Sequence, residues 1–240
     1  MGRIKGQKPS MKELTLQVLM WTTFAKKQIT SAGLQHALAV EVGELELDEE
    51  NIPLIDTILS VCAGLVTLDE ESKIVRLVHY TTQEYLQKTQ ERWCPGSDAE
   101  FNIATTCIAY LSLNEFQPGF CEIPTERAQS YPLYGYAAGN WGYHVQGASR
   151  SCPGVLAFLQ CTEKLWTSVQ LLHGLRSPRF NVDGPKNETG LELASWFGIH
   201  EALDARWVEN LVESQDFVGE TPLSWAEPMV HFRRMSLIYE

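Results

Sequence analysis

The chain has 240 residues, of which 44% are hydrophobic and 20% charged, and its formal net charge is −11 at pH 7. This composition is typical of a globular protein with one large domain or two to three small ones. The acidic balance argues against nucleic acid or an anionic membrane as a partner of the whole chain.

No apolar run reaches the roughly 18–20 residues that a membrane-spanning helix needs. The basic start MGRIKGQKPSMKEL lacks the apolar segment of a secretory signal. The six cysteines form no CxxC pair, which is typical of reduced thiols rather than of a disulfide framework. We therefore expect a cytoplasmic protein.

The first hundred residues show the pattern of a winged helix. Residues 1–10 predict a disordered basic tail, and the helical spacing of apolar residues over 11–26 predicts a first helix. Thr30 is placed to cap a second helix, and Asn51 is placed to cap a third with Pro53 in its first turn.

Two short apolar runs, residues 65–68 and 74–78, flank the charged turn DEESK and predict a β-hairpin. Three helices followed by a two-stranded hairpin is the element order of a winged-helix domain, which we expect to cover residues 11–92. A fourth helix should follow the hairpin.

His79 stands where the second strand gives way to that helix. It shares strand parity with Val75 and Leu77, so we expect it on a half-buried face. The pattern Thr81-x-x-Glu84 predicts a capping box, which explains the start of the helix without any ligand. His79 could be satisfied by a nearby carbonyl or could contact a ligand, and the sequence leaves both interpretations open.

Residues 97–176 predict a helical connector domain, with a boundary at the loop WCPGSD before it and a linker-like segment RSPRFNVDGP after it. Its aromatic-rich stretch YPLYGYAAGNWGYHV is typical of packing within a core or between domains.

The last sixty residues contain an internal repeat, because TGLELASWFG at 189–198 aligns with TPLSWAEPMV at 221–230. The offset of 32 residues is close to the ankyrin period of about 33, and the T-P-L-H-x-A signature is matched in part, with Gly190 and Glu192 replacing its Pro and His. We expect an incomplete ankyrin-repeat region over residues 186–240, with two degenerate units starting near 187 and 219. The signature positions are Thr189, Leu191, Ala194, Thr221, Pro222, Leu223 and Ala226.

Four aromatic residues stand out in this region: Trp196, Phe197, Trp207 and Trp225. They could pack between repeats or serve as exposed anchors for a protein partner. The predicted fold class is thus mainly α: a winged helix, a helical connector and the start of an ankyrin array.

The chain lacks the motifs of common enzymes. It has no GxSxG elbow, no HExxH pair, no Cys/His pairs at metal-ligand spacing and no Walker A loop, so we expect no enzyme activity, metal or cofactor of its own. The predicted third helix, NIPLIDTILSVCAG, has no basic residue and follows an acidic block, which disfavours DNA binding.

Several long strings together resemble the middle of fungal NACHT–ankyrin proteins, members of the NOD-like receptor class of STAND-type NTPases. These strings are LQHALAVEVGELELDEENI, VCAGLVTLDEESKIVRLVHYTTQEYL, YPLYGYAAGNWGYH and GETPLSWA, and the resemblance covers about residues 12–226. In that family a NACHT nucleotide-binding module precedes the winged helix, and ankyrin repeats sense protein partners. The resemblance implies that His79 touches the β-phosphate of bound ADP where such a module is present.

The resemblance implies a non-catalytic regulatory and protein-interaction segment of a signalling receptor, here a truncated or fragmentary gene product without its NACHT module. Its partners would be proteins bound through the repeats, and an NTPase module in cis or in trans. A stand-alone ankyrin-type adaptor or scaffold is the alternative. A winged-helix DNA-binding protein and an undetected hydrolase are less favoured.

Overall fold

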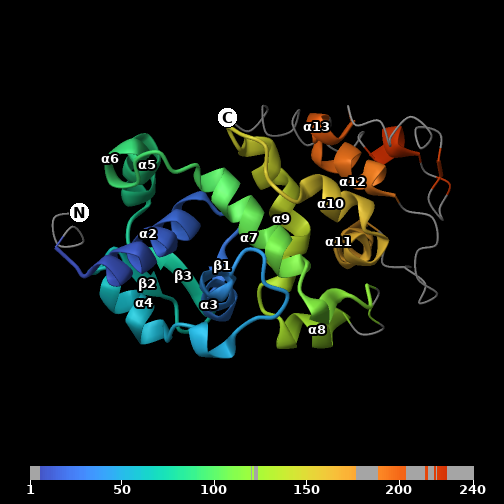
Figure 1. The fold of residues 1–240 in the computed structure, drawn as a ribbon. Coiled ribbons are helices and arrows are strands. Elements are labelled where there is room, and N and C mark those ends of the chain that lie inside the picture. Colours follow the sequence, from blue (N-terminus) through green and yellow to red (C-terminus); the bar gives the residue numbers. More distant parts are fainter. Residues whose placement is uncertain are drawn as a thin grey trace.

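Helices dominate the fold, and one small antiparallel sheet lies among them (Figure 1). The structure is a computed structural model that describes residues 6–119, 121, 124–176, 189–203, 214–215, 219 and 221–225. The predicted linker beyond Arg176, the residues Trp207 and Ala226 and the first five residues of the predicted basic tail lie outside this described part. No helix within it combines the length and the apolarity needed to cross a membrane.

The first part of the chain has the element order helix, strand, two helices, and a hairpin followed by a further helix, which is that of a winged helix. The predicted mainly α fold with a winged helix is therefore confirmed at this level. Its elements are α2 (Pro9–Phe24), β1 (Ile29–Thr30), α3 (Ser31–Ala39), the 3-10 turn η1 (Glu49–Asn51), α4 (Ile55–Val61), β2 (Val66–Leu68), β3 (Ile74–Leu77), α5 (Tyr80–Lys88) and α6 (Gln90–Trp93).

The sheet has three strands in the order β1-β3-β2, all antiparallel, where the sequence predicts only the hairpin. In the hairpin, Thr67 pairs with Arg76 across the two strands. The added strand β1 is two residues long and pairs Ile29 with Val75. A segment this short has no alternation that a sequence pattern could reveal.

The start of α4 differs from the prediction. Asn51 is the last residue of η1, and the helix begins only at Ile55, with Leu54 as its N-cap. Ile52 precedes Pro53, and a residue before proline is driven into extended conformations, which Ile52 adopts with φ −71° and ψ 111°. The helix therefore starts only after Pro53, and Asn51 does not cap it. The Asn51 side chain instead donates a hydrogen bond to Glu41 at 2.9 Å.

The predicted capping box at Thr81 and Glu84 is also wrong. Helix α5 starts at Tyr80, with His79 in the N-cap position and no side-chain capping bond, so Thr81 already lies within the first turn. Tertiary contacts position α5 instead, because Leu86 is buried and Gln83 donates to the carbonyl of Thr23 at 3.0 Å.

The connector follows as a set of helices, of which α7 and α9 pack along each other at its centre. In Figure 1 these two helices stand between the winged helix and helices α10 to α13. The elements are α7 (Ala99–Leu111), η2 (Asn114–Phe116), α8 (Pro124–Ser130), α9 (Tyr134–Gly147), α10 (Val155–Gln160), α11 (Thr162–Arg176), α12 (Gly190–Phe197) and α13 (His200–Leu203).

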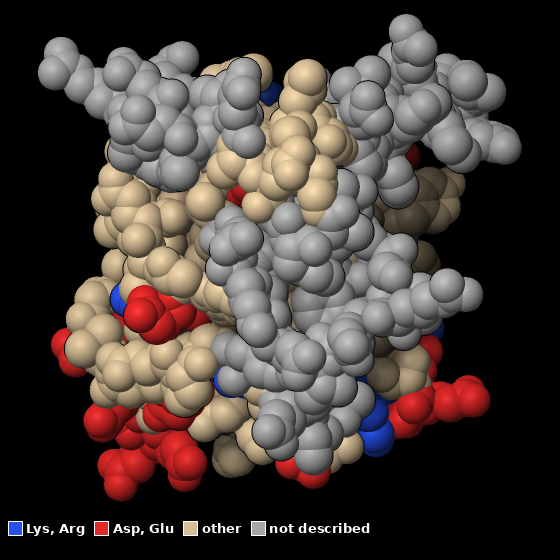
Figure 2. Space-filling model, turned by 90° about the vertical axis from the view of Figure 1, so that its right-hand side faces the viewer, with Lys and Arg blue, Asp and Glu red and all other residues tan. Residues whose placement is uncertain are grey.

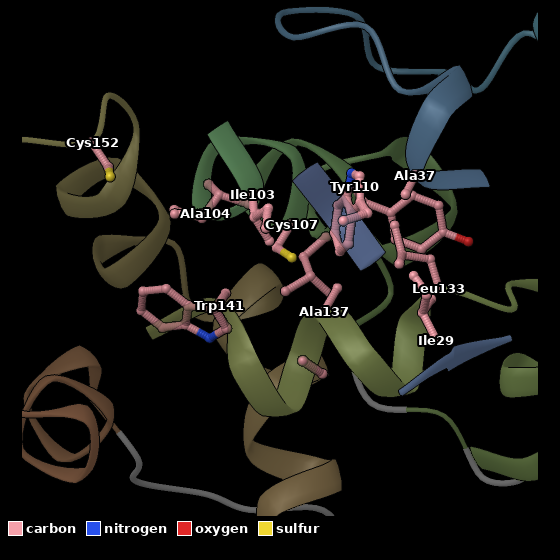
Figure 3. Close-up of a cluster of buried hydrophobic side chains, with 14 of the residues drawn as sticks. Ile29, Ala37, Ile103, Ala104, Cys107, Tyr110, Leu133, Ala137, Trp141 and Cys152 are labelled. Atoms are coloured by element: carbon pink, nitrogen blue, oxygen red, sulfur yellow. The ribbon is translucent and has the colours of Figure 1, made fainter. Parts of the chain in front are cut away.

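One continuous set of buried side chains runs from the winged helix through the connector to α12. Figure 3 shows its middle, where Cys107 and Tyr110 of α7 face Ala137 and Trp141 of α9. The winged helix joins this core through Trp21, whose ring meets that of Tyr136 edge-on at a centroid distance of 5.5 Å. The loop WCPGSD therefore separates two stretches of sequence that share one core.

Candidate functional site

The candidate site is built around His79, which follows β3 and precedes α5. Its side chain is exposed, so the expectation of a half-buried face is wrong. The strand alternation that buries Val75 ends at Leu77, where the chain leaves the sheet. A helical turn begins directly afterwards, in which the carbonyl of His79 accepts a hydrogen bond from the N–H of Thr82 at 3.0 Å. The imidazole is thereby free to face outward from the start of a helix.

His79 lines a cleft of ≈ 540 Å³ between the second half of α2, strands β1 and β3, and the start of α5. Two cationic side chains, Lys27 and Arg76, line the same cleft, and polar groups surround them. The other polar lining residues are Thr22, Gln28, Thr67, Tyr80 and Gln83.

The lining residues of this cleft include no carboxylate, although the chain as a whole carries a net charge of −11. Asp69 lies nearby and contacts Arg76 through Oδ2 and Nη2 at 3.1 Å, and both side chains are partly exposed. Hydrogen bonds from Ser72 hold the pKa of Asp69 below its ordinary value, so Asp69 neutralises part of the Arg76 charge. The remaining charge favours an anion in the cleft.

Side-chain hydrogen bonds join α5 to the end of α2 beside the cleft. Gln83 and Gln87, one turn apart on α5, both donate to the carbonyl of Thr23, at 3.0 and 3.4 Å. Such side-chain bonds satisfy a carbonyl at the end of α2 that has no helical partner. They fix the distance between the end of α2 and the residues at the start of α5.

Three large side chains are exposed in and near the cleft, of which Val78 and Tyr80 line it and Tyr85 lies further along α5. Val78 is 45% exposed, Tyr80 is 78% exposed and Tyr85 is 53% exposed. Tyrosine is enriched at protein interfaces because its ring offers contact area and its hydroxyl a hydrogen bond. The cleft is therefore bordered by a surface suited to a protein partner.

The face that a winged helix would use to read DNA is unsuited to that task. Helix α4 has no basic residue, and the loop before it exposes acidic side chains, as does the hairpin tip at Glu70 and Glu71. Acidic side chains also crowd the lower edge of the face drawn in Figure 2. Phosphates would be repelled from the helix that should enter the major groove.

In the repeat region, the first predicted unit is a capped helix. The Thr189 side chain accepts from the N–H of Leu191 at 3.3 Å, and the carboxylate of Glu192 accepts from the N–H of Thr189 at 2.8 Å. Leu191 and Ala194 are buried, as the signature predicts for inward-facing positions.

The second unit agrees less well with the signature. Pro222 is buried, and Thr221 lies within 3.2 Å of the hydroxyl of Ser224, but Leu223 is 77% exposed and does not point inward. A fully buried Trp225 anchors this turn instead, since its ring meets Trp196 at 6.1 Å.

The proposed aromatic anchors are mostly inside the protein. Phe197 and Trp225 have no exposed surface, and Trp196 is partly buried. Packing is thus the role the structure gives to both residues: Phe197 packs on Trp141 and Tyr143 of α9, and Trp225 packs on Trp196. Sequence reasoning missed Lys27 and Arg76, because nothing local links a lysine after the first helix to an arginine in the hairpin.

One comparison with known proteins finds a similarity in the first part of the chain. A family model described as "GPI inositol-deacylase, winged helix domain" matches residues 5–104, which include all elements from α2 to α6 and the start of α7. The match covers every residue that lines the cleft beside His79. No curated protein and no solved structure matches the chain.

Proposed function

We propose that the chain is a non-catalytic regulatory and protein-interaction segment of a NACHT–ankyrin signalling receptor of the NOD-like class. In this role the winged helix reports the nucleotide state of an NTPase module, and the repeat region contacts protein partners. The observation that carries the proposal is the carboxylate-free cleft in which His79, Lys27 and Arg76 meet.

The chemistry of the cleft suits a diphosphate. Lysine ammonium and arginine guanidinium groups donate charge-assisted hydrogen bonds to phosphate oxygens, and a histidine can add a further donor. The exposed surface of Val78, Tyr80 and Tyr85 beside the cleft supports a protein module bound over it. The nucleotide would then lie between that module and the winged helix, with His79, Lys27 and Arg76 facing its phosphates.

The repeat region supports the interaction half of the proposal. Thr189 and Thr221 occupy matching positions 32 residues apart, and each begins a helical turn against the same body of the protein. Ankyrin-type units stack so that each buries a face of its neighbour, and the edge-on contact between the rings of Trp196 and Trp225 supports such an arrangement. Protein partners would bind the surface that such stacking leaves outward.

The test is titration of the full chain with inorganic pyrophosphate and with ADP, followed by NMR of its histidine rings. We expect saturable shifts at His79 with a millimolar Kd, about −4 kcal/mol, because the other half of the site would come from the NTPase module. His36 lies outside the cleft and serves as the internal reference. Shifts of equal size at both rings, or none at His79, would contradict the assignment.

A further inference from the structure

Four residues close a ring of hydrogen bonds where the winged helix meets the connector. Lys26 follows α2, Glu100 lies in α7, and Tyr136 and His144 lie in α9. The His144 ring has no exposed surface, and its Nδ1 lies 2.5 Å from Glu100 Oε2 while its Nε2 lies 2.7 Å from the Tyr136 hydroxyl. The Tyr136 oxygen accepts from the backbone N–H of Lys26 at 3.0 Å, and Lys26 Nζ lies 2.6 Å from Glu100 Oε1.

The ring of bonds is complete when His144 is neutral. With its proton on Nδ1, His144 donates to the Glu100 carboxylate, and its Nε2 accepts from the Tyr136 hydroxyl. The Tyr136 oxygen is then free to accept from the Lys26 amide, and the Lys26 ammonium donates to the second carboxylate oxygen. Each of these four contacts then pairs one donor with one acceptor.

A second proton on His144 breaks this pattern at one bond. Nε2 changes from acceptor to donor, so the Tyr136 hydroxyl loses the acceptor for its own proton and must share its oxygen with both Nε2–H and the Lys26 amide. Tyr136 is partly buried, and its hydroxyl gives up a hydrogen bond when Nε2 no longer accepts from it. The Tyr136 oxygen has two lone pairs and can accept from both donors only by turning its own proton away from Nε2, and the charged Nε2–H then holds the oxygen more strongly than the Lys26 amide does.

The charged groups around His144 act in opposite directions, and burial is stronger than either. Burial lowers the pKa of His144, Glu100 raises it, and Lys26 lowers it. In the described part of α7, the thiol of Cys107 also acts on Tyr136, and burial raises the pKa of that thiol. The net result is a histidine that is neutral at physiological pH and takes up a proton only on acidification.

We propose that this ring is a proton-operated joint, which holds the end of α2 on α7 and α9 while His144 is neutral and releases Lys26 when His144 is protonated. The joint is connected to the cleft beside His79 because Lys27, the residue after Lys26, lines that cleft. Acidification would therefore loosen one wall of the cleft before it unfolds the core. The joint is independent of whether the cleft binds a nucleotide.

The experiment measures amide hydrogen exchange of the full chain by NMR between pH 5 and pH 8. The Lys26 amide reports the joint, and the Ser31 amide, which donates to the carbonyl of Lys73 at 2.7 Å inside the winged helix, reports the rest of the domain. We expect the protection factor of Lys26 to fall on acidification by up to about tenfold per pH unit, the limit for one proton, while that of Ser31 holds.

Two variants separate the joint from a general acid effect. His144→Gln should make Lys26 protection independent of pH over this range, whereas His36→Gln, which removes another histidine bonded to a tyrosine at 3.0 Å, should leave the wild-type profile unchanged. A profile that survives in His144→Gln would overturn the proposal, as would Lys26 and Ser31 losing protection together.

If His144→Gln does not fold, Tyr136→Phe provides the second measurement. It removes the hydroxyl that donates to Nε2, so neutral His144 loses a partner and the pKa of His144, read from its ring signals, should rise relative to the wild type. An unchanged or lowered His144 pKa in Tyr136→Phe would exclude the joint.

Discussion

The ring of Phe197 fills the space beside Gly142 that any side chain at position 142 would occupy. This relationship docks α12 on α9, and it brings together a glycine in the connector and an aromatic residue of the repeat region. Trp141 and Tyr143 hold the ring from both sides, with edge-on contacts at 5.1 and 5.0 Å. Helix α12 thus packs into the core of the connector.

Gly142→Ala should destabilise the protein because its methyl group would overlap the Phe197 ring. We expect a loss of about 1–3 kcal/mol in the free energy of unfolding, measured by urea denaturation, as is usual for overpacking. Gly135→Ala in the same helix is the control, because nothing lies within 4 Å of the added methyl group there. The control should be neutral or gain up to about 1 kcal/mol from helix propensity, and equal losses in both variants would refute the packing argument.

Glu192→Gln should flatten the dependence of stability on pH. Glu192 has no exposed surface, and burial raises its pKa above the ordinary value of 4.5. A raised folded-state pKa means that its favourable contribution is complete below 4.5 and is lost as the pH rises through the folded-state pKa. Glu192→Gln removes the ionisable carboxyl group, so the variant does not lose stability in this way as the pH rises.

Urea unfolding at several pH values tests the Glu192 prediction. The variant should gain stability relative to the wild type as the pH rises from 4.5 to neutrality, provided that the Gln amide keeps the bonds to Thr189. A variant that loses stability most at neutral pH would show that the carboxylate charge itself is needed for the cap. Thr189→Ala should cost about 1 kcal/mol through the loss of the cap alone.

Arg76→Glu should abolish the binding of pyrophosphate in the cleft beside His79, because it replaces a cation of the lining with a carboxylate. Lys73→Glu is the matched control, since it makes the same change of charge at the hairpin tip, outside the cleft lining, where Lys73 pairs with Glu70 at 2.9 Å. The His79 NMR signal measures the binding of pyrophosphate to both variants. Equal weakening by the two variants would mean that pyrophosphate senses overall charge and has no site in the cleft.

The chain should not bind duplex DNA, even at low salt where phosphate contacts are strongest. The physical reason is the acidic surface around α4 and at the hairpin tip. An electrophoretic mobility shift at low ionic strength checks this prediction, and a shift that weakens steeply with added salt would make the DNA-binding alternative the better one.

Local sequence patterns were sufficient wherever a short stretch controls its own structure. The helical periodicity before Phe24, the Thr30 cap and the two hairpin strands were all predictable, because each depends on residues a few positions apart. The Thr30 side chain accepts from the N–H of Gly33 at 3.1 Å, as the pattern predicts.

The same patterns failed where distant groups compete with local ones. Thr81 and Glu84 have the spacing of a capping box, yet the bonds from α5 to Thr23 place the start of the helix earlier. Gly190 departs from the ankyrin signature, and only the fold gives the reason: the carbonyl of Leu159 in α10 lies where a side chain at position 190 would begin.

By itself the sequence determined the order of the helices and the hairpin, and hence the winged helix, because helix and strand periodicities depend on residues that are close together in the chain. The tertiary structure alone decided that Lys27, Arg76 and His79 line one cleft and that Lys26, Glu100, Tyr136 and His144 close one ring. Lys27 lies 49 positions from Arg76, and Glu100 lies 44 positions from His144, so no local pattern signals that these residues meet. Their contacts follow from how the helices pack, and burial then sets the charge state of groups such as His144.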